Sequence, residues 1–170
     1  MRTSTRLLLI FGGYVVAFAA AALLLQVRLW LTDTPDAQAS AGMYAFGDGM
    51  FFLAALGLGS LVPTAALLIF FRSSRALWAA VAALALLVAA SGLVAVGLFA
   101  TQRLASSIAA DPTIQIWCAL SVLRLLPAPL VFVALALATA IAPPSLARRT
   151  LVASLGVETL VVVAAATFWL

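Results

Sequence analysis

The chain has 170 residues, a length typical of one domain, but its composition is not that of a water-soluble domain. Hydrophobic residues make up 66% and charged residues 8%, and the mean hydropathy is +1.26, whereas soluble domains are about half apolar and about a quarter charged. The sequence therefore predicts an integral membrane protein. We attribute the net charge of +4 to basic residues that set the membrane topology and contact anionic lipid, and not to nucleic-acid binding.

Several residue types are missing, and their absence excludes several kinds of chemistry. No histidine is present, which excludes bis-histidine haem ligation, a histidine general base and the commonest zinc sites. No lysine or asparagine is present, which excludes lysine Schiff bases and N-glycosylation. Cys118 is the single cysteine, so an intrachain disulfide is excluded, and its apolar neighbours predict an inert thiol. We predict no catalytic residue, no metal site and no cofactor.

Five long apolar segments are separated by shorter links. Each can cross a hydrocarbon core of about 30 Å, and continuous apolar runs indicate helices, not the alternating strands of a barrel. We therefore predict an all-α integral membrane protein with a single transmembrane domain over residues 1–170. The first segment follows Arg2 and Arg6 as a signal peptide would, but its length favours a retained span. The five predicted transmembrane helices cover about 7–31, 49–71, 76–99, 113–141 and 150–170.

The arginines divide unequally between the two sides of the predicted path. Paired arginines precede the first span and fill the links between spans two and three and between spans four and five. The links on the other side hold four aspartates, with only Arg28 and Arg103 as basic residues near the span ends. Because basic residues accumulate on the cytoplasmic side, we predict a cytoplasmic N-terminus and a C-terminus outside. The six predicted cytoplasmic arginines are Arg2, Arg6, Arg72, Arg75, Arg148 and Arg149.

The first outer loop, residues 32–48, is predicted to contain a short interfacial helix. Thr34-Pro35-Asp36 is typical of a helix start. Methionine and aromatic residues that favour the membrane interface follow at Met43, Tyr44 and Phe46. Asp48 is predicted to cap the second span. We interpret the loop as a solvated connector, with a lid, binding surface or partner contact as the alternative.

The remaining links are explained by local structure. Residues 71–75 predict a tight turn, and Trp78 beyond them is expected to anchor at the inner interface. Pro143 and Pro144 predict the end of the fourth span because they lack amide donors, and Ser145 is expected to cap the fifth.

The most informative residue is an arginine deep inside the fourth span. Arg124 lies about 18 Å along the helix from Pro112, where an unpaired charge costs about 2.5 to 3.5 kcal/mol. Glu158 of the fifth span is predicted at nearly the same depth, so we predict an ion pair between Arg124 and Glu158. Asp48 is the competing partner.

Other polar residues within the spans predict a polar interior seam. Ser121 shares a helix face with Arg124, and Ser154 shares one with Glu158. Ser60 and Thr64 form a small polar stripe with Gly57 on the second span. These groups fit a tightly packed bundle that contains one buried ion pair. In the alternative interpretation they line a cavity or ligand site.

Prolines and a tyrosine inside the spans bear on the choice between a packed bundle and a ligand site. Pro63 and the pair Pro127 and Pro129 are expected to interrupt backbone hydrogen bonds and free carbonyl oxygens, as in a transporter site. Tyr14 lies within the inner half of the first span, where its hydroxyl requires a hydrogen-bond partner.

These features favour a small non-enzymatic polytopic membrane protein, a subunit or an accessory or assembly partner. The alternative is a small carrier or channel for an anionic solute, ion or lipid that uses Arg124 and Glu158. An intramembrane enzyme would depend on Asp48 or Glu158 for acid chemistry and is disfavoured. The expected partners are membrane lipids and either a second copy of the chain or another membrane protein, without nucleic acid. The lysine-free, alanine-rich composition indicates a GC-rich bacterial genome. We therefore expect a multi-pass protein of the bacterial cytoplasmic (inner) membrane.

Overall fold

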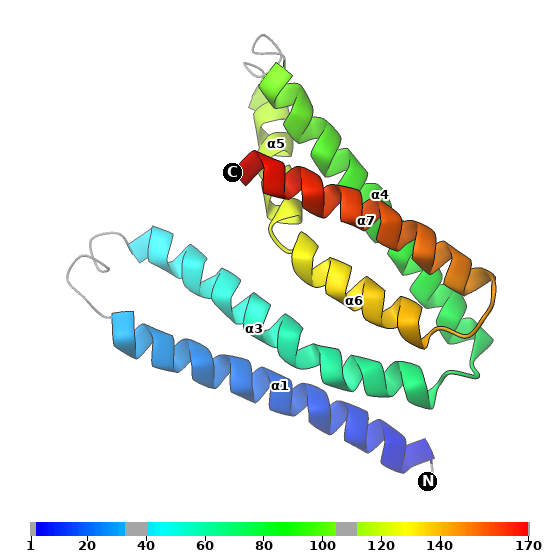
Figure 1. Cartoon of the computed structure of the whole chain (residues 1–170). Coiled ribbons are helices and arrows are strands. Elements are labelled where there is room, and N and C mark those ends of the chain that lie inside the picture. The colour runs from blue at the N-terminus through cyan, green and yellow to red at the C-terminus, as the bar shows by residue number, and fades with distance from the viewer. Residues whose placement is uncertain (1–2, 33–40, 105–111, 170) are drawn as a thin grey trace. The chain divides into compact units, whose positions relative to one another are not determined.

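The computed structural model describes residues 3–32, 41–104 and 112–169, and this part of the chain is helical, without strands (Figure 1). The all-α prediction is confirmed for these residues. The helices are α1 (Thr3–Thr32), α3 (Ala41–Phe70), α4 (Arg75–Leu104), α5 (Pro112–Leu125), α6 (Ala128–Ile141) and α7 (Leu146–Trp169).

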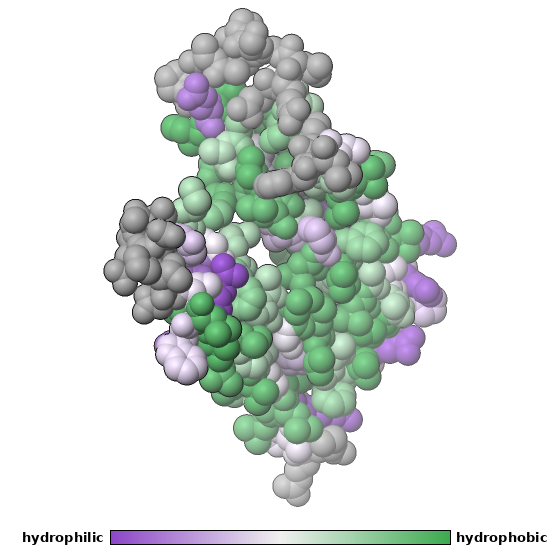
Figure 2. Space-filling model, turned by 60° about the vertical axis from the view of Figure 1, so that its left-hand side comes forward, coloured by the Kyte–Doolittle hydropathy of each residue, from purple (hydrophilic) through white to green (hydrophobic). Residues whose placement is uncertain are grey.

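Several of these helices are long and apolar enough to cross a membrane. α1, α3, α4 and α7 meet this criterion singly, and α5 with α6 meets it as a bent pair, so the described residues hold four or five candidate spans. A helix of 30 residues, such as α3, is about 45 Å long and exceeds a hydrocarbon core of about 30 Å. Large apolar side chains are widely exposed, and the face shown in Figure 2 is mostly hydrophobic in its described part. These properties are compatible with a multi-pass membrane protein.

The chain divides into two compact units, Met1–Phe70 and Phe71–Leu170. The single domain over 1–170 stays a prediction. In the first unit α1 and α3 lie side by side and run antiparallel. At one end the Arg6 guanidinium lies 5.7 Å from the centroid of the Phe70 ring, and at the other Arg28 Nε lies 2.7 Å from Asp48 Oδ1.

Small residues let α1 and α3 approach closely between these ends. A Cβ atom added to Gly13 would lie 2.9 Å from Pro63 Cβ, and one added to Gly59 would lie 3.2 Å from Ala17 Cβ. Glycine at position 13 therefore admits the proline ring of the neighbouring helix. Pro63 lies inside α3 and does not end it.

A hydroxyl pair joins the same two helices. The Tyr14 hydroxyl lies 2.8 Å from Thr64 Oγ1, and Thr64 Oγ1 donates its own proton to the Ser60 carbonyl at 2.7 Å. Tyr14 therefore donates to Thr64. This bond supplies the partner that the sequence required for Tyr14.

In the second unit, α4 packs against α5 and α7, and α6 packs against α7 (Figure 1). Its apolar core combines small and branched side chains from several helices. Alanine in this core lets the helices approach closely enough for polar groups to meet across them. The core cluster consists of Ala95, Leu125, Ala128, Val161 and Ala165.

The predicted fourth span is broken into two helices. α5 ends at Leu125, α6 begins at Ala128, and their axes differ by 50°. Pro127 and Pro129 lack amide protons, so the carbonyls of Leu123 and Leu125 cannot receive the usual bond from four residues on. The expected interruption at these prolines is confirmed, and it places a helix terminus beside Arg124.

The second long helix begins before the second predicted span, which covers about 49–71. α3 begins at Ala41, so Met43, Tyr44 and Phe46 belong to its first turns and not to a separate surface helix. Asp48 lies inside α3, seven residues after its first, and is therefore not the cap of this helix. Its carboxylate instead pairs with Arg28 of α1. Thr34-Pro35-Asp36 falls outside the described residues.

Two further local predictions require correction. The Ser145 hydroxyl donates to the Pro143 carbonyl at 3.2 Å, and no described amide of α7 donates to it. Trp78 is buried, with Nε1 donating to the Arg72 carbonyl at 3.0 Å, because the turn before α4 folds over it. It is therefore a packing residue of the second unit and not an exposed interfacial anchor.

Candidate functional site

The break between α5 and α6 positions the principal polar residue. Arg124 lies in the last turn of α5, where a cation interacts favourably with the exposed carbonyls of the helix end. Its side chain is 18% exposed. Arg124 Nη2 lies 2.9 Å from Glu158 Oε2 and 3.1 Å from Oε1, so the predicted ion pair is present.

Glu158 lies on the buried face of α7. The residues of this face recur at helical spacing, and each is fully or almost fully buried: Leu151, Ser154, Glu158 and Val161. A carboxylate with 0% side-chain exposure is costly unless it is paired, and here both of its oxygens accept from Arg124. The sequence of α7 therefore forces the glutamate into the helix interface, and the arginine neutralises it there.

α4 completes the polar centre. Arg124 Nε donates to Ser91 Oγ at 2.9 Å, and Nη2 also donates to the Val88 carbonyl at 3.0 Å. Ser91 Oγ in turn donates to the same Val88 carbonyl at 2.7 Å. One guanidinium thus connects α5 to α7 through an ion pair and to α4 through hydrogen bonds.

The close approach of α4 depends on a glycine. A Cβ atom on Gly92 would lie 2.9 Å from Val161 Cγ2, 3.2 Å from Arg124 Nη2 and 3.4 Å from Glu158 Oε2. Sequence reasoning missed Ser91 and Gly92 as members of this centre. The available signal was that Ser91 is the single hydroxyl residue in the predicted span 76–99 and stands next to a glycine.

Two buried polar atoms in the described part of the chain lack a hydrogen-bond partner. They are Arg124 Nη1 and Ser154 Oγ. Ser121, one turn before Arg124, donates to the Trp117 carbonyl at 2.8 Å. Ser121 and Ser154 therefore flank the ion pair, but neither hydrogen-bonds to its charged groups.

A pocket of about 280 Å³ reaches Arg124 between α4 and α5. Ser91 and Ser121 also line it. The rest of the lining is apolar and consists of Val94, Ala95, Leu98, Trp117 and Leu120. The pocket therefore combines an arginine with a mainly apolar wall.

The remaining candidate residues lie in the first unit. Asp48 pairs with Arg28, whose guanidinium also lies 5.0 Å from the centroid of the Phe51 ring. The alternative pairing of Asp48 with Arg124 is therefore wrong. Ser60 and Thr64 belong to the α1–α3 contact through the bond with Tyr14. Sequence reasoning missed Arg28 as the partner of Asp48, because two partners on separate helices show no characteristic spacing in the sequence.

Other chemistry is sparse among the described residues. Cys118 is buried, and its thiol lies 3.6 Å from the Leu98 carbonyl. No group of three or more cysteine, aspartate or glutamate residues that could hold a metal ion occurs in the described ranges. Comparisons with protein-family models, curated proteins and solved structures found no match.

Proposed function

We propose that this chain is a small non-catalytic polytopic membrane protein, a subunit or an accessory or assembly partner of another membrane component. The observation that carries this proposal is the Arg124–Glu158 pair, buried where α4, α5 and α7 meet. Because Glu158 is fully buried and both its oxygens contact Arg124, the pair serves to hold helices together.

The proposed topology has five spans, with α5 and α6 as one broken span. The N-terminus is cytoplasmic and the C-terminus lies outside, because the paired arginines then share the cytoplasmic side. The proposed location is a bacterial cytoplasmic membrane.

The exposed surface of α1 and α3 supports a role in contacts with other membrane proteins. Only 17% of the most apolar window of α1 and 11% of that of α3 is buried. Large apolar side chains of both helices are left exposed, where lipid, a second copy of the chain or another membrane protein can cover them.

The test is purification of the tagged chain from its native membrane in a mild detergent, followed by identification of what accompanies it. The proposal expects a stoichiometric membrane-protein partner or a defined oligomer, retained after washing at high salt. A chain that remains monomeric with lipid alone, both in detergent and after cross-linking in the membrane, contradicts it.

A carrier or channel for a small anionic solute, ion or lipid is the second candidate, and specific features favour it. Arg124 Nη1 lacks a partner among the described residues, and a pocket of about 280 Å³ reaches this side chain. The neighbouring helix break resembles the discontinuous helices that form transporter sites.

Flux measurements separate the two candidates. A carrier loaded into liposomes as the full chain moves a labelled small anion, and Arg124→Gln abolishes the flux in protein that remains folded. Absence of flux above protein-free liposomes for several small anions contradicts the carrier.

A further inference from the structure

Two neighbouring cavities flank the turn between α6 and α7. One has a volume of about 590 Å³ and the other about 670 Å³, and both are lined by Pro144, Ser145 and Leu146. The first, which we call the basic cavity, extends to the turn before α4 and to the first two turns of that helix. Its residues on this side are Arg72, Ser73, Arg75, Trp78, Ala79 and Ala82.

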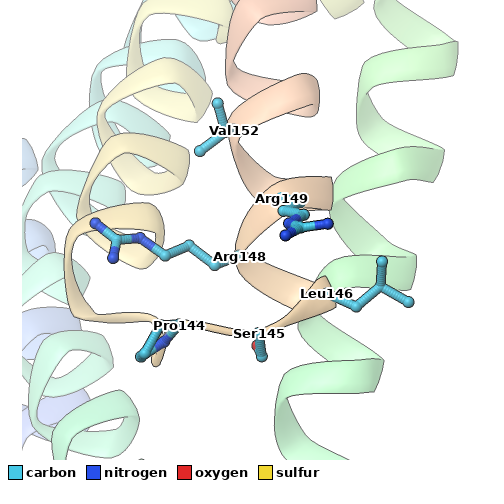
Figure 3. Close-up of a pocket in the computed structure, with 6 residues that line it drawn as sticks. All are labelled: Pro144, Ser145, Leu146, Arg148, Arg149 and Val152. Carbon is cyan, nitrogen blue, oxygen red and sulfur yellow. The ribbon is translucent and has the colours of Figure 1, made fainter.

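The cavities carry positive charge that no described carboxylate neutralises. Arg72 and Arg75 line the basic cavity, and Arg148 and Arg149 line its neighbour. Figure 3 shows the side chains of Arg148 and Arg149 leaving α7 on opposite sides. The ion pairs within the described ranges involve only Arg28 and Arg124. These exposed guanidinium groups are therefore available to an anion.

The walls of the basic cavity are held by internal contacts. Trp78 Nε1 donates to the Arg72 carbonyl at 3.0 Å, and the Leu77 amide donates to Ser74 Oγ at 3.3 Å. On the opposite wall, Pro143 and Pro144 restrict the backbone of the turn. A cavity whose walls are already ordered loses little conformational entropy when it binds a ligand.

The lining is apolar as well as basic. Ala79 and Ala82 of α4 face the same space as Leu146 and Ala147 of α7. Arginine presents a planar fork of donors that matches phosphate oxygens, and small apolar residues leave room for a hydrocarbon chain. A suitable ligand therefore carries a phosphate next to an apolar tail.

We propose that the basic cavity binds the phosphate of an anionic phospholipid, with Arg72 and Arg75 holding the headgroup. The acyl chains then run along Ala79 and Ala82 on α4, which continues from the cavity as an apolar helix long enough to span a membrane. Basic pockets between spanning helices on the cytoplasmic side are a common form of headgroup site. This inference rests on the proposed topology but not on the proposed protein partner.

The experiment titrates the full chain in an uncharged detergent with phosphatidylglycerol or phosphatidylcholine of identical acyl chains, and native mass spectrometry counts the lipid retained. Phosphatidylglycerol should bind and phosphatidylcholine should not. Arg75→Gln or Arg72→Gln should weaken binding about fivefold, the contribution of one arginine near an anionic surface. Arg6→Gln removes the same charge at the predicted cytoplasmic end but does not line the cavity, and it should change binding less than about twofold.

Three results would overturn the lipid site. Equal binding of the two lipids would show that the site does not select for a net negative headgroup. Equal losses in Arg6→Gln and in both cavity variants, each monodisperse by size exclusion, would show diffuse attraction. Displacement of the lipid by an equal concentration of inorganic phosphate would show a free-anion site. Lipid binding without a copurifying protein would refute only the proposed partnership.

Discussion

At the scale of single residues, the second unit depends on a buried ion pair and on a glycine that lies against it. Gly92 leaves space where Arg124 meets Glu158, because a Cβ atom there would lie 3.2 Å from Arg124 Nη2 and 3.4 Å from Glu158 Oε2. The pair differs from Arg28–Asp48, where the arginine side chain is 37% exposed. A partly exposed pair contributes about 0 to 1 kcal/mol, whereas removing one partner of a buried pair costs about 3 to 5 kcal/mol. We therefore assign the larger energetic role to Arg124–Glu158.

Substitution of Gly92 by alanine should destabilise the second unit by about 1 to 3 kcal/mol, because the new methyl group overlaps Val161 Cγ2 and crowds Arg124. Chemical unfolding in detergent micelles measures the change. Gly97→Ala is the matched control on the same helix, since nothing lies within 4 Å of a Cβ atom there. Equal stability of the two variants would contradict the close packing at Gly92.

At the scale of elements, two devices set how the helices meet: small residues at the α1–α3 contact and prolines at the α5–α6 break. The contact places Gly13 against Pro63 and Gly59 against Ala17. The break removes backbone donors at Pro127 and Pro129 and turns the chain by 50°. The small residues act by letting two backbones approach, and the prolines act by removing backbone donors. Neither depends on burying apolar area, which lipid covers equally well.

Gly13→Ala should weaken the α1–α3 contact by about 1 to 3 kcal/mol, because its Cβ atom would lie 2.9 Å from Pro63 Cβ. Gly12→Ala adds the same methyl group one residue earlier, where nothing lies within 4 Å, and should have no such effect. Steric trapping or unfolding of the full chain in bicelles measures both. A larger loss in Gly12→Ala than in Gly13→Ala would exclude this register of the hairpin.

The double substitution Pro127→Ala and Pro129→Ala should straighten the chain between α5 and α6. It restores the amide donors to the Leu123 and Leu125 carbonyls, so a continuous helix becomes available. Residual dipolar couplings in bicelles report the angle between α5 and α6, which should fall from 50° to below about 20°. An angle that stays near its original value would mean that packing, and not proline, imposes the bend.

At the scale of the whole molecule, each of the two units is held together by its own internal contacts. The chain passes from one unit to the other at the turn that carries Arg72. Three chain segments with paired arginines lie at ends of apolar segments. In the proposed topology these segments lie on the cytoplasmic side of the membrane.

The orientation is testable by labelling. With Cys118 replaced by alanine, single cysteines at Ser73 and Ser145 should react with a membrane-impermeant maleimide in inside-out vesicles and not in intact spheroplasts. Both positions are exposed turns beside the predicted cytoplasmic arginines. Labelling of either position from outside would refute the predicted topology.

The sequence predicts the helices well because long apolar runs have few alternatives in lipid, and it predicts the Arg124–Glu158 pair because both residues stand at similar depth in consecutive spans. It does not predict the partners of Arg28 or the place of Ser91 and Gly92. Those depend on which helix faces meet and in what register. A helix such as α4, with small and apolar residues on all its faces, carries little periodic signal. The early start of α3 was missed for a related reason, since the partner that allows Asp48 inside a helix lies on another helix.

The central claim is that Arg124 and Glu158 hold the second unit together as a pair, and a double-mutant cycle tests it most directly. The free energy of unfolding in micelles is measured for Arg124→Gln, Glu158→Gln and the double variant. The account predicts that each single substitution costs about 3 to 5 kcal/mol, because it leaves an uncompensated buried charge, and that the double variant recovers most of this loss. Single substitutions that leave stability unchanged, or a double variant whose loss equals the sum of the two, would contradict it.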